Sequence, residues 1–392
     1  MRHGSGRTRV SVPRERFHGE TRVALVPASV PQLTRCGLDV IVEREAGVAA
    51  GHPDEAYLQH GATIGSAQEV FDADVVLRVN GWGIDPDGLG RDQASWPGQV
   101  VIGLADPLGS PRVVAEAAER GLTGFALDLV PRITRAQAMD ALSSQATVVG
   151  YRAVLLAADR LPKMLPMLTT AAGTVPAAQV FVIGAGVAGL QAIATARRLG
   201  AVVQAYDVRP AAQEEIESLG ARCVLLPLAP GDAEDRSGYA KELGDAFYRR
   251  QQDLLAETVP GADVVISTAL IPGRRAPVLI TERAVRGMAR GSVIVDCAAE
   301  RGGNCELTRP DDVVLTEGGV TILGPTNLPA TVPRDASFMY SKNVTAFLSL
   351  LVEDGVPAID QDDVIVRETL VTRGGTVVHP RVLRSLAEVQ HV

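Results

Sequence analysis

The sequence predicts an α/β protein made of two Rossmann-like domains with parallel sheets, separated by a cleft and linked by long helices. Short apolar runs alternate with helical stretches along the chain, as in folds whose parallel strands are joined by helices. A glycine-rich turn follows one of these runs, within residues 179–189. The length of 392 residues is enough for two large domains.

The first series of strands lies in the first third of the chain. Its apolar runs are residues 9–12, 38–43, 74–79, 99–104 and 122–127. The helical stretches between them are residues 28–36, 53–60 and 111–120. This spacing suits right-handed crossovers, so we expect a parallel sheet.

A second series begins after Gly173. Its strands are expected at residues 179–183, 202–207, 222–226, 263–268, 292–297 and 321–323. A mostly helical stretch, residues 136–161, links the two series. Proline, glycine and acidic residues interrupt the pattern at residues 229–239, which is typical of a surface loop.

The last part of the chain is expected to return to the first domain. Residues 341–352 predict a helix that packs there, and the tail beyond Gly355 is expected to be β-rich. The first domain would then comprise residues 1–140 and 326–392, and residues 141–325 would form the second, Rossmann domain.

Composition and charge exclude two classes of partner. The net charge of -8 and the pI near 5.4 argue against nucleic acid, which requires a clustered basic surface. No stretch supplies about 20 unbroken apolar residues, so we expect no direct membrane insertion. The four cysteines show no metal-ligand spacing, and no metal is expected.

The segment QVFVIGAGVAGLQAIATARRLGAVVQAYDV, residues 179–208, predicts a dinucleotide-binding βαβ unit. An apolar strand precedes Gly184-x-Gly186-x-x-Gly189, and an apolar helix follows it. The glycines suit a tight turn, close approach of a pyrophosphate and close packing of helix on strand. The free N–H groups of the helix would face the phosphates, beside Ala185 and Val187. A tight turn without a ligand is the alternative.

Asp207 ends the second strand of this unit, about 20 residues after the glycines. Its carboxylate is placed to accept hydrogen bonds from the adenosine ribose, and a 2′-phosphate would meet like charge there. NAD(H) is therefore favoured over NADP(H). Arg209 follows Val208 and could instead hold such a phosphate, but Asp207 occupies the strand end itself.

Several segments resemble the alanine dehydrogenase/transhydrogenase superfamily. The opening VPRERFHGETRVALVPASVPQL resembles the start of that group. Four further segments resemble the NAD(H)-binding alpha subunit (domain I, the first piece of a split subunit) of proton-translocating NAD(P) transhydrogenase. They are VPRITRAQAMDALSSQATVVGYRAV, SGYAKEL, STALIPGRRAPVLIT with SVIVDCAAERGGNCE, and TNLPATVPRDASFMYSKNV.

The resemblance implies a function shared between subunits. This component would bind NADH and pass hydride to NADP⁺ held by an NADP(H)-binding beta subunit, while membrane subunits couple the transfer to proton movement. It also implies a homodimer held peripherally, through those partners, on the cytoplasmic face of the inner membrane. The enzyme class would be the Re/Si-specific transhydrogenase, active only with its partner subunits.

The resemblance also assigns roles to individual residues. Arg132 and Asp140 would position the nicotinamide and its carboxamide, with Ser143 as a polar contact. Gln137 would reach the ribose near the nicotinamide and align the partner's nucleotide. Tyr239 would close a mobile lid, residues 229–239. The candidate cofactor-binding residues are, in all, Gly184, Ala185, Gly186, Val187, Gly189, Asp207, Val208, Arg209, Tyr239, Thr268, Ala269 and Leu270.

The alternative is a soluble NAD-dependent amino-acid dehydrogenase of the alanine type. Oxidation of an amine needs an acid/base group, and in that relative a Lys and a His follow the third and fourth strands. Asn80 and Gly103 stand there in this chain, and Glu300 aligns with a late Asp. The carboxylate anchor Arg22 is present, and His18 shares its loop. A third hypothesis is a non-enzymatic NAD sensor. Gln137 and Tyr239 disfavour it, because a sensor need not present the nicotinamide to a partner.

Overall fold

The computed structural model describes residues 7–80, 96–226, 244–271 and 273–390. The chain divides into two compact units. Unit 1 comprises Met1–Gln145 and Pro329–Val392, and unit 2 comprises Ala146–Leu328. Unit 2 is therefore inserted into unit 1. The boundaries lie after Gln145 and Leu328, compared with residues 140 and 325 in the sequence prediction.

Unit 1 is built on an eight-stranded sheet in the order β19-β18-β6-β5-β4-β1-β2-β3. Its strands are β1 (Arg9–Val12), β2 (Asp39–Glu43), β3 (Thr63–Gly65), β4 (Val75–Asn80), β5 (Val100–Leu104), β6 (Thr123–Ala126), β18 (Leu370–Arg373) and β19 (Thr376–Val377). The first six are parallel and have the order 3-2-1-4-5-6 of dinucleotide-binding folds. The predicted α/β class is confirmed, but β18 and β19 pair antiparallel at one edge.

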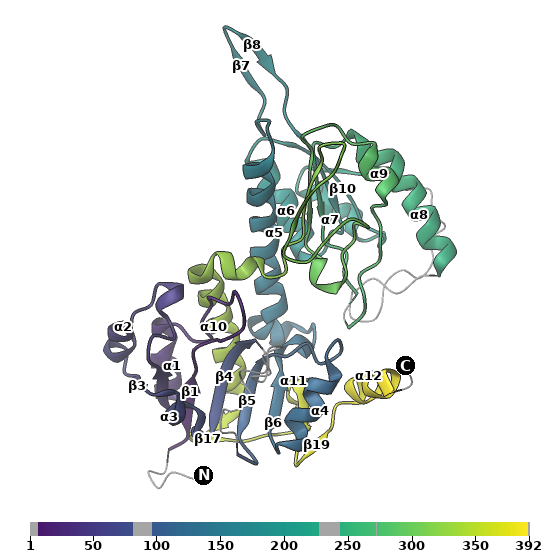
Figure 1. The fold of residues 1–392 in the computed structure, drawn as a ribbon. Helices are drawn as coiled ribbons and strands as arrows, with labels where there is room; N and C mark the ends of the chain where they lie inside the picture. Colours follow the sequence, from purple (N-terminus) through teal and green to yellow (C-terminus); the bar gives the residue numbers. More distant parts are fainter. Residues whose placement is uncertain (1–6, 81–95, 227–243, 272, 391–392) are drawn as a thin grey trace. The chain divides into compact units, whose positions relative to one another are not determined.

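The helices of unit 1 connect these strands and cover the sheet (Figure 1). They are α1 (Val30–Arg35), α2 (Asp54–Gln59), α3 (Ala67–Phe71), α4 (Pro111–Glu119), α10 (Pro333–Leu350), α11 (Val364–Thr369) and α12 (Pro380–Gln390). The prediction of a β-rich tail beyond Gly355 was wrong in part, because α11 and α12 lie there beside the short hairpin of β16 (Val352–Glu353) and β17 (Val356–Pro357). The helix α12 has an apolar face, and Val382 on that face is fully buried.

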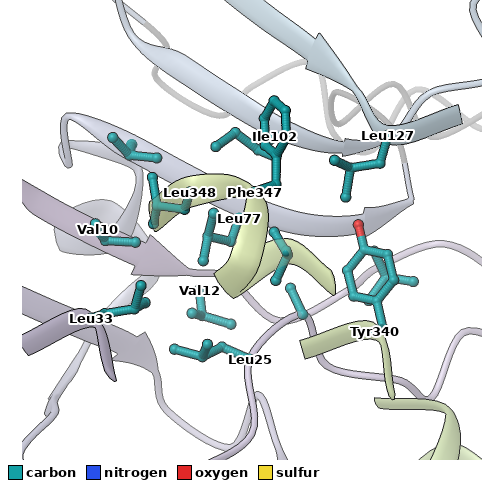
Figure 2. Close-up of a cluster of buried hydrophobic side chains, with 14 of the residues drawn as sticks. Val10, Val12, Leu25, Leu33, Leu77, Ile102, Leu127, Tyr340, Phe347 and Leu348 are labelled. Carbon is teal, nitrogen blue, oxygen red and sulfur yellow. The ribbon is translucent and has the colours of Figure 1, made fainter. Parts of the chain in front are cut away.

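The return of the chain to unit 1 completes the apolar core of that unit. Phe347 and Leu348 of α10 lie beside Leu77 and Ile102 of the sheet (Figure 2). The ring of Phe347 meets that of Phe125 edge to face, with 5.5 Å between centroids. The helix predicted at residues 341–352 is therefore confirmed in its packing, although it begins earlier, at Pro333.

Unit 2 has a seven-stranded sheet in the order β11-β10-β9-β12-β13-β15-β14. Its strands are β9 (Gln179–Ile183), β10 (Val202–Tyr206), β11 (Arg222–Cys223), β12 (Val264–Ser267), β13 (Val293–Asp296), β14 (Val313–Leu315) and β15 (Thr321–Leu323). Only β14 is antiparallel to its neighbour. The helices of unit 2 that follow β9 are α6 (Val187–Arg198), α7 (Ala212–Ser218), α8 (Asp245–Thr258) and α9 (Glu282–Arg286).

Two further elements lie before β9. The helix α5 (Ala141–Arg160) begins in unit 1 and continues into unit 2. It is followed by a hairpin of β7 (Leu168–Thr170) and β8 (Gly173–Val175), which projects from unit 2 (Figure 1). Every residue of both hairpin strands is exposed, so no alternation of buried and exposed positions marked them in the sequence. None of the described helices combines the length and hydropathy needed to cross a membrane.

Gly150 brings α5 and α6 into backbone contact. A Cβ atom at Gly150 would lie 2.9 Å from the carbonyl carbon of Ala188, and closer still to its oxygen, and 3.0 Å from the amide nitrogen of Ala192. Such distances are inside van der Waals contact, and the obstructing atoms are backbone. A side chain at residue 150 would therefore force the two helices apart.

We predict that Gly150→Ala destabilises the chain by roughly 1–3 kcal/mol, which is the usual cost of overpacking a close contact. The measurement is the urea midpoint followed by circular dichroism. Gly261→Ala is the matched control in the same unit, because a Cβ there would meet nothing within 4 Å. Equal midpoints for the two variants would contradict the prediction.

Asp128 is a desolvated carboxylate at the carboxyl end of β6. Its oxygens accept hydrogen bonds from the backbone N–H groups of Ala105 at 2.6 Å and Asp106 at 3.2 Å. Burial raises the pKa of Asp128 to about 6. The nearby carboxylate of Asp106 raises it as well, while the hydrogen bond from Ala105 opposes the shift. The folded chain therefore binds this proton more tightly than the unfolded chain does.

This raised pKa predicts a pH-dependent stability difference. The folded state loses its preferred proton as the pH rises from about 4 to above 6, so the contribution of Asp128 to stability falls over that window. Asp128→Asn should therefore gain stability relative to the wild type between pH 4 and 7.5, by up to about 3 kcal/mol. Urea denaturation at three pH values measures this difference. A difference that is flat with pH, or equal to that of the exposed control Asp159→Asn, would refute the assignment.

Candidate dinucleotide-binding site

The turn between β9 and α6 has the conformation that the glycine spacing predicts. Gly184 follows β9 with a φ of +91°, a region that glycine adopts without a steric penalty. Its N–H donates to the carbonyl oxygen of Tyr206 at 2.8 Å, which ties the turn to β10. A Cβ atom at this position would lie 2.8 Å from Oγ1 of Thr268. Two neighbouring strands therefore hold the turn in place.

Gly186 leaves the first turn of α6 open. It is the N-cap of the helix, no side chain caps it, and a Cβ there would meet nothing within 4 Å. Gly186 and Val187 are both exposed. The first N–H groups of a helix have no partner within the helix and favour an anion. This open turn is therefore a suitable site for a diphosphate.

Gly189 sets the distance between the helix and the strand. A Cβ atom there would lie 2.8 Å from the carbonyl carbon of Gly184, and closer to its oxygen. No side chain larger than hydrogen fits between α6 and the turn. The three glycines thus occupy three different environments: a left-handed turn, open space and a backbone contact.

Asp207 lies directly after β10 and is bonded to the glycine turn. Its Oδ2 accepts a hydrogen bond from the N–H of Ala185 at 2.7 Å, and its Oδ1 accepts from the N–H of Arg209 at 2.8 Å. The side chain of Arg209 also contacts this carboxylate, at 3.0 Å from Nε to Oδ1. The structure thus brings Ala185, Asp207 and Arg209 together, with the half-buried Val208 between the last two in the chain.

The segment after β12 completes this edge of the sheet. Oγ1 of Thr268 donates to the carbonyl oxygen of Gly184 at 3.1 Å, while Ala269 is half-buried and Leu270 exposed. Asn304, which is fully buried, holds this segment through hydrogen bonds to Ser267 and Ala269, the residues before and after Thr268. Its Oδ1 accepts from Oγ of Ser267 at 2.7 Å and from the N–H of Ala269 at 3.1 Å.

Asn304 is a positioning residue that sequence reasoning missed. Its Nδ2 also donates to the carbonyl oxygens of Ala269 and Pro277, at 2.8 Å each. The segment GGNCE carries part of the family resemblance, but a lone asparagine after two glycines has no pattern that reveals such contacts. Tyr239 and the predicted lid, residues 229–239, lie outside the described residues.

The nicotinamide-side candidates lie in unit 1. Arg132 and Gln137 are exposed, the latter on a 3₁₀ helix, Thr134–Met139. Asp140 and Ser143 are brought together at the start of α5, where Oδ1 of Asp140 accepts from the N–H of Ser143 at 2.8 Å and Oδ2 from its Oγ at 2.5 Å. This is N-cap geometry, so the carboxylate of Asp140 stabilises the helix on which Ser143 lies.

Gly103, which the resemblance aligns with a His of alanine-type dehydrogenases, has no room for a side chain. A Cβ atom there would lie 2.8 Å from the carbonyl oxygen of Arg78 on β4. Asn80 ends β4 and donates from Nδ2 to Oε2 of Glu20 at 2.6 Å. Neither residue supplies a group that exchanges a proton near neutral pH.

Arg22 is present but is held by protein groups. Its Nε and Nη2 donate to the two carboxylate oxygens of Glu20 at 2.8 and 2.7 Å, and its Nη1 donates to Gln145 at 2.8 Å. The side chains of Arg22 and Glu20 are 5% and 0% exposed. A ligand carboxylate would have to compete with Glu20 for this guanidinium. His18 and Glu300, by contrast, are both exposed.

Comparisons with known proteins identify the family of this chain. Residues 11–149 match the model of the alanine dehydrogenase/PNT N-terminal domain, and residues 153–380 match that of the C-terminal domain. The first piece of the NAD(P) transhydrogenase subunit alpha of Rhodospirillum rubrum is 45% identical over 95% of this chain and 98% of its own. The crystal structure of transhydrogenase from Sinorhizobium meliloti superposes with a TM-score of 0.82, at 44% identity, and covers 94% of this chain and all of its own.

A dehydrogenase relative is more distant. The alanine dehydrogenase of Bacillus subtilis is 28% identical over 96% of this chain and 94% of its own. Both domain models and the transhydrogenase relatives extend over almost the whole sequence, as the opening and internal motifs predicted. The chain belongs to the alanine dehydrogenase/PNT family, and within it is most similar to the transhydrogenase alpha subunits among these relatives.

Proposed function

We propose that this chain is the NAD(H)-binding component of a proton-translocating NAD(P) transhydrogenase, and that it passes hydride between NADH and NADP⁺ held by a partner subunit. The observation that supports this most is a combination within the described residues. A dinucleotide turn is present, but Asn80 and Gly103 stand where the proton chemistry of a dehydrogenase would be. Transfer of hydride between two nicotinamides needs two aligned rings and no proton acceptor.

In this proposal the glycine turn holds the diphosphate of NAD(H). The uncapped N–H groups at the start of α6 would donate to its oxygens, and Gly186 would allow the close approach. Asp207 would accept from the adenosine ribose. Bound NADH would supply the hydride, and the protein would supply only position and electrostatics. Thr268, Ala269 and Leu270, which follow β12 beside the glycine turn, would contact the bound nucleotide.

The nicotinamide end is assigned to four residues of unit 1. Arg132 and Asp140 would orient the ring and its carboxamide, and Ser143 would add a polar contact. The cap geometry supports this assignment, because a carboxylate fixed by two hydrogen bonds keeps its orientation when a ligand arrives. Gln137 is exposed and would reach the nicotinamide ribose and the nucleotide of the partner. Tyr239 would close over the bound nucleotide.

The partners in this proposal are the NADP(H)-binding beta subunit, the membrane subunits and a second copy of the chain. The chain would lie on the cytoplasmic face of the inner membrane through those subunits. The exposed hairpin of β7 and β8 supports a homodimer. Leu168 and Val175 are 37% and 40% exposed on it, beside Met164 at 51% and Met167 at 65%. Apolar side chains gathered on a projecting element are typical of a contact with another chain.

The proposed activity predicts a result that separates a transhydrogenase from a dehydrogenase. The full chain alone should bind NADH in a calorimetric titration and should not reduce NAD⁺ with L-alanine, because it lacks the acid/base group. Addition of a membrane fraction that holds the partner subunits should restore hydride transfer from NADH to an NADP⁺ analogue, followed by absorbance. Oxidation of L-alanine by the isolated chain at ordinary enzyme rates would refute the proposal.

Another prediction concerns Gln137. Gln137→Ala should lower the rate of hydride transfer with partner subunits by roughly tenfold or more, the scale expected for lost alignment. The affinity of the same variant for NADH should change by less than about threefold, since that affinity depends mainly on the Rossmann unit. Gln68→Ala, an exposed glutamine on α3, is the matched control and should change neither quantity. Equal losses of transfer and of NADH affinity would refute the aligning role.

A further inference from the structure

The guanidinium of Arg209 is bonded to the carboxylate of Asp207, which the proposed function assigns to the adenosine ribose. Its Nε donates to Oδ1 of Asp207 at 3.0 Å and its Nη2 to Oδ2 at 3.2 Å. The same Nη2 lies 3.3 Å from the carbonyl oxygen of Ala185 in the glycine turn. The side chains of Arg209 and Asp207 are 15% and 8% exposed. This pair is thus largely withdrawn from water, and the guanidinium lies on the carboxylate oxygens assigned to the ribose.

The acceptor sites of Asp207 are already filled. An ionised carboxylate offers about four lone-pair positions. Two accept the backbone N–H groups of Ala185 and Arg209, at 2.7 and 2.8 Å, and two accept the side chain of Arg209. A ribose diol that donates to this carboxylate must therefore displace a donor. The backbone donors belong to the turn itself, so the donor that can leave is the guanidinium.

We propose that Arg209 determines the preference between NAD(H) and NADP(H), and that its ion pair with Asp207 prevents it from binding a 2′-phosphate. In the ligand-free chain its guanidinium closes the adenosine-ribose subsite, and the ribose hydroxyls of NAD(H) displace it. The same contact keeps Arg209 from serving a 2′-phosphate, for which a guanidinium is a suitable partner. This inference rests on the proposed function, because it takes Asp207 as the adenosine-ribose contact.

A single substitution should then change the nucleotide preference. Without the carboxylate, the like charge that repels a 2′-phosphate is gone and Arg209 is released beside the same subsite. A nearby arginine accommodates the 2′-phosphate in Rossmann sites that bind NADP(H), and this chain already has one two residues after the acidic position. Asp207, whose negative charge repels the 2′-phosphate of NADP(H), is thus paired with Arg209, whose positive charge would attract it.

The test is a double-mutant cycle on the full chain. Calorimetric titrations would compare the wild type, Asp207→Ser, Arg209→Ala and the double variant. The ligands are NADH and NADPH, together with ADP and 2′,5′-ADP, fragments that probe the adenosine end alone. Asp207→Asn repeats the test with a side chain whose oxygen still accepts from Ala185, in case serine loosens the turn. Arg283→Ala is the matched control, because Arg283 pairs with Asp253 at 3.0 Å on an exposed surface of the same unit.

Asp207→Ser should bind 2′,5′-ADP at least about tenfold more tightly than the wild type does, because the released guanidinium pairs with the 2′-phosphate. It should bind NADH about tenfold more weakly, because a hydrogen bond to a charged group is lost. The increase in affinity for 2′,5′-ADP should shrink at high salt and vanish in the double variant. Arg209→Ala should bind NADH at least as tightly as the wild type, because no guanidinium has to be displaced. Arg283→Ala should match the wild type with every ligand.

Two results would overturn the inference while leaving the proposed function intact. The first is a wild type that binds NADH together with Asp207 variants that show no increase in affinity for 2′,5′-ADP. The second is a loss of NADH affinity above about threefold in Arg209→Ala, which would make Arg209 a direct contact of NAD(H). Failure of the folded wild type to bind NADH at all would instead refute the proposed function.

Discussion

Direct contact between backbone segments around the first turn of α6 is the constraint on which the candidate site depends. Gly189 meets the turn after β9, and Ala188 meets Gly150 of α5, with no side chain between them in either case. The open N-terminus of α6 is therefore held by packing of backbone against backbone rather than by flexible side chains. A phosphate-binding turn placed in this way needs little reorganisation when an anion arrives.

Much of unit 2 could be predicted from the sequence, because the relevant signals are local. A strand, three glycines and a helix within one segment determine the turn, and a carboxylate at the end of the next parallel strand necessarily lies beside it. Asp207, which lies directly after β10 and accepts a hydrogen bond from the glycine turn, is an example. The class of unit 1 also followed from alternating apolar runs, although its edge strands β18 and β19 come from the tail and pair antiparallel.

Other features of the site became clear only in the structure, some because they depend on contacts between distant residues and some because a local contact has more than one possible role. Asn304 holds the segment after β12 from about 35 residues away. The cap of α5 by Asp140 is a local contact that its spacing to Ser143 allows, whereas the resemblance assigns both residues to the nicotinamide. The side chain of Arg209 could be expected near the ribose, yet only the structure shows that it lies on Asp207.

The insertion of unit 2 into unit 1 has a consequence for biosynthesis. A ribosome delivers the chain from its N-terminus, and domains generally fold as they emerge. The first six strands of unit 1 are made before α10, which covers their apolar face, and before β18, which protects the edge of β6. All the strands of unit 2 lie in one continuous stretch of the chain, Ala146–Leu328. Unit 2 can therefore complete its core before residues 329–392 of unit 1 have been made. While unit 2 is being translated, the sheet of unit 1 therefore lacks both α10 and β18, and an exposed apolar face with an unpaired strand edge favours aggregation.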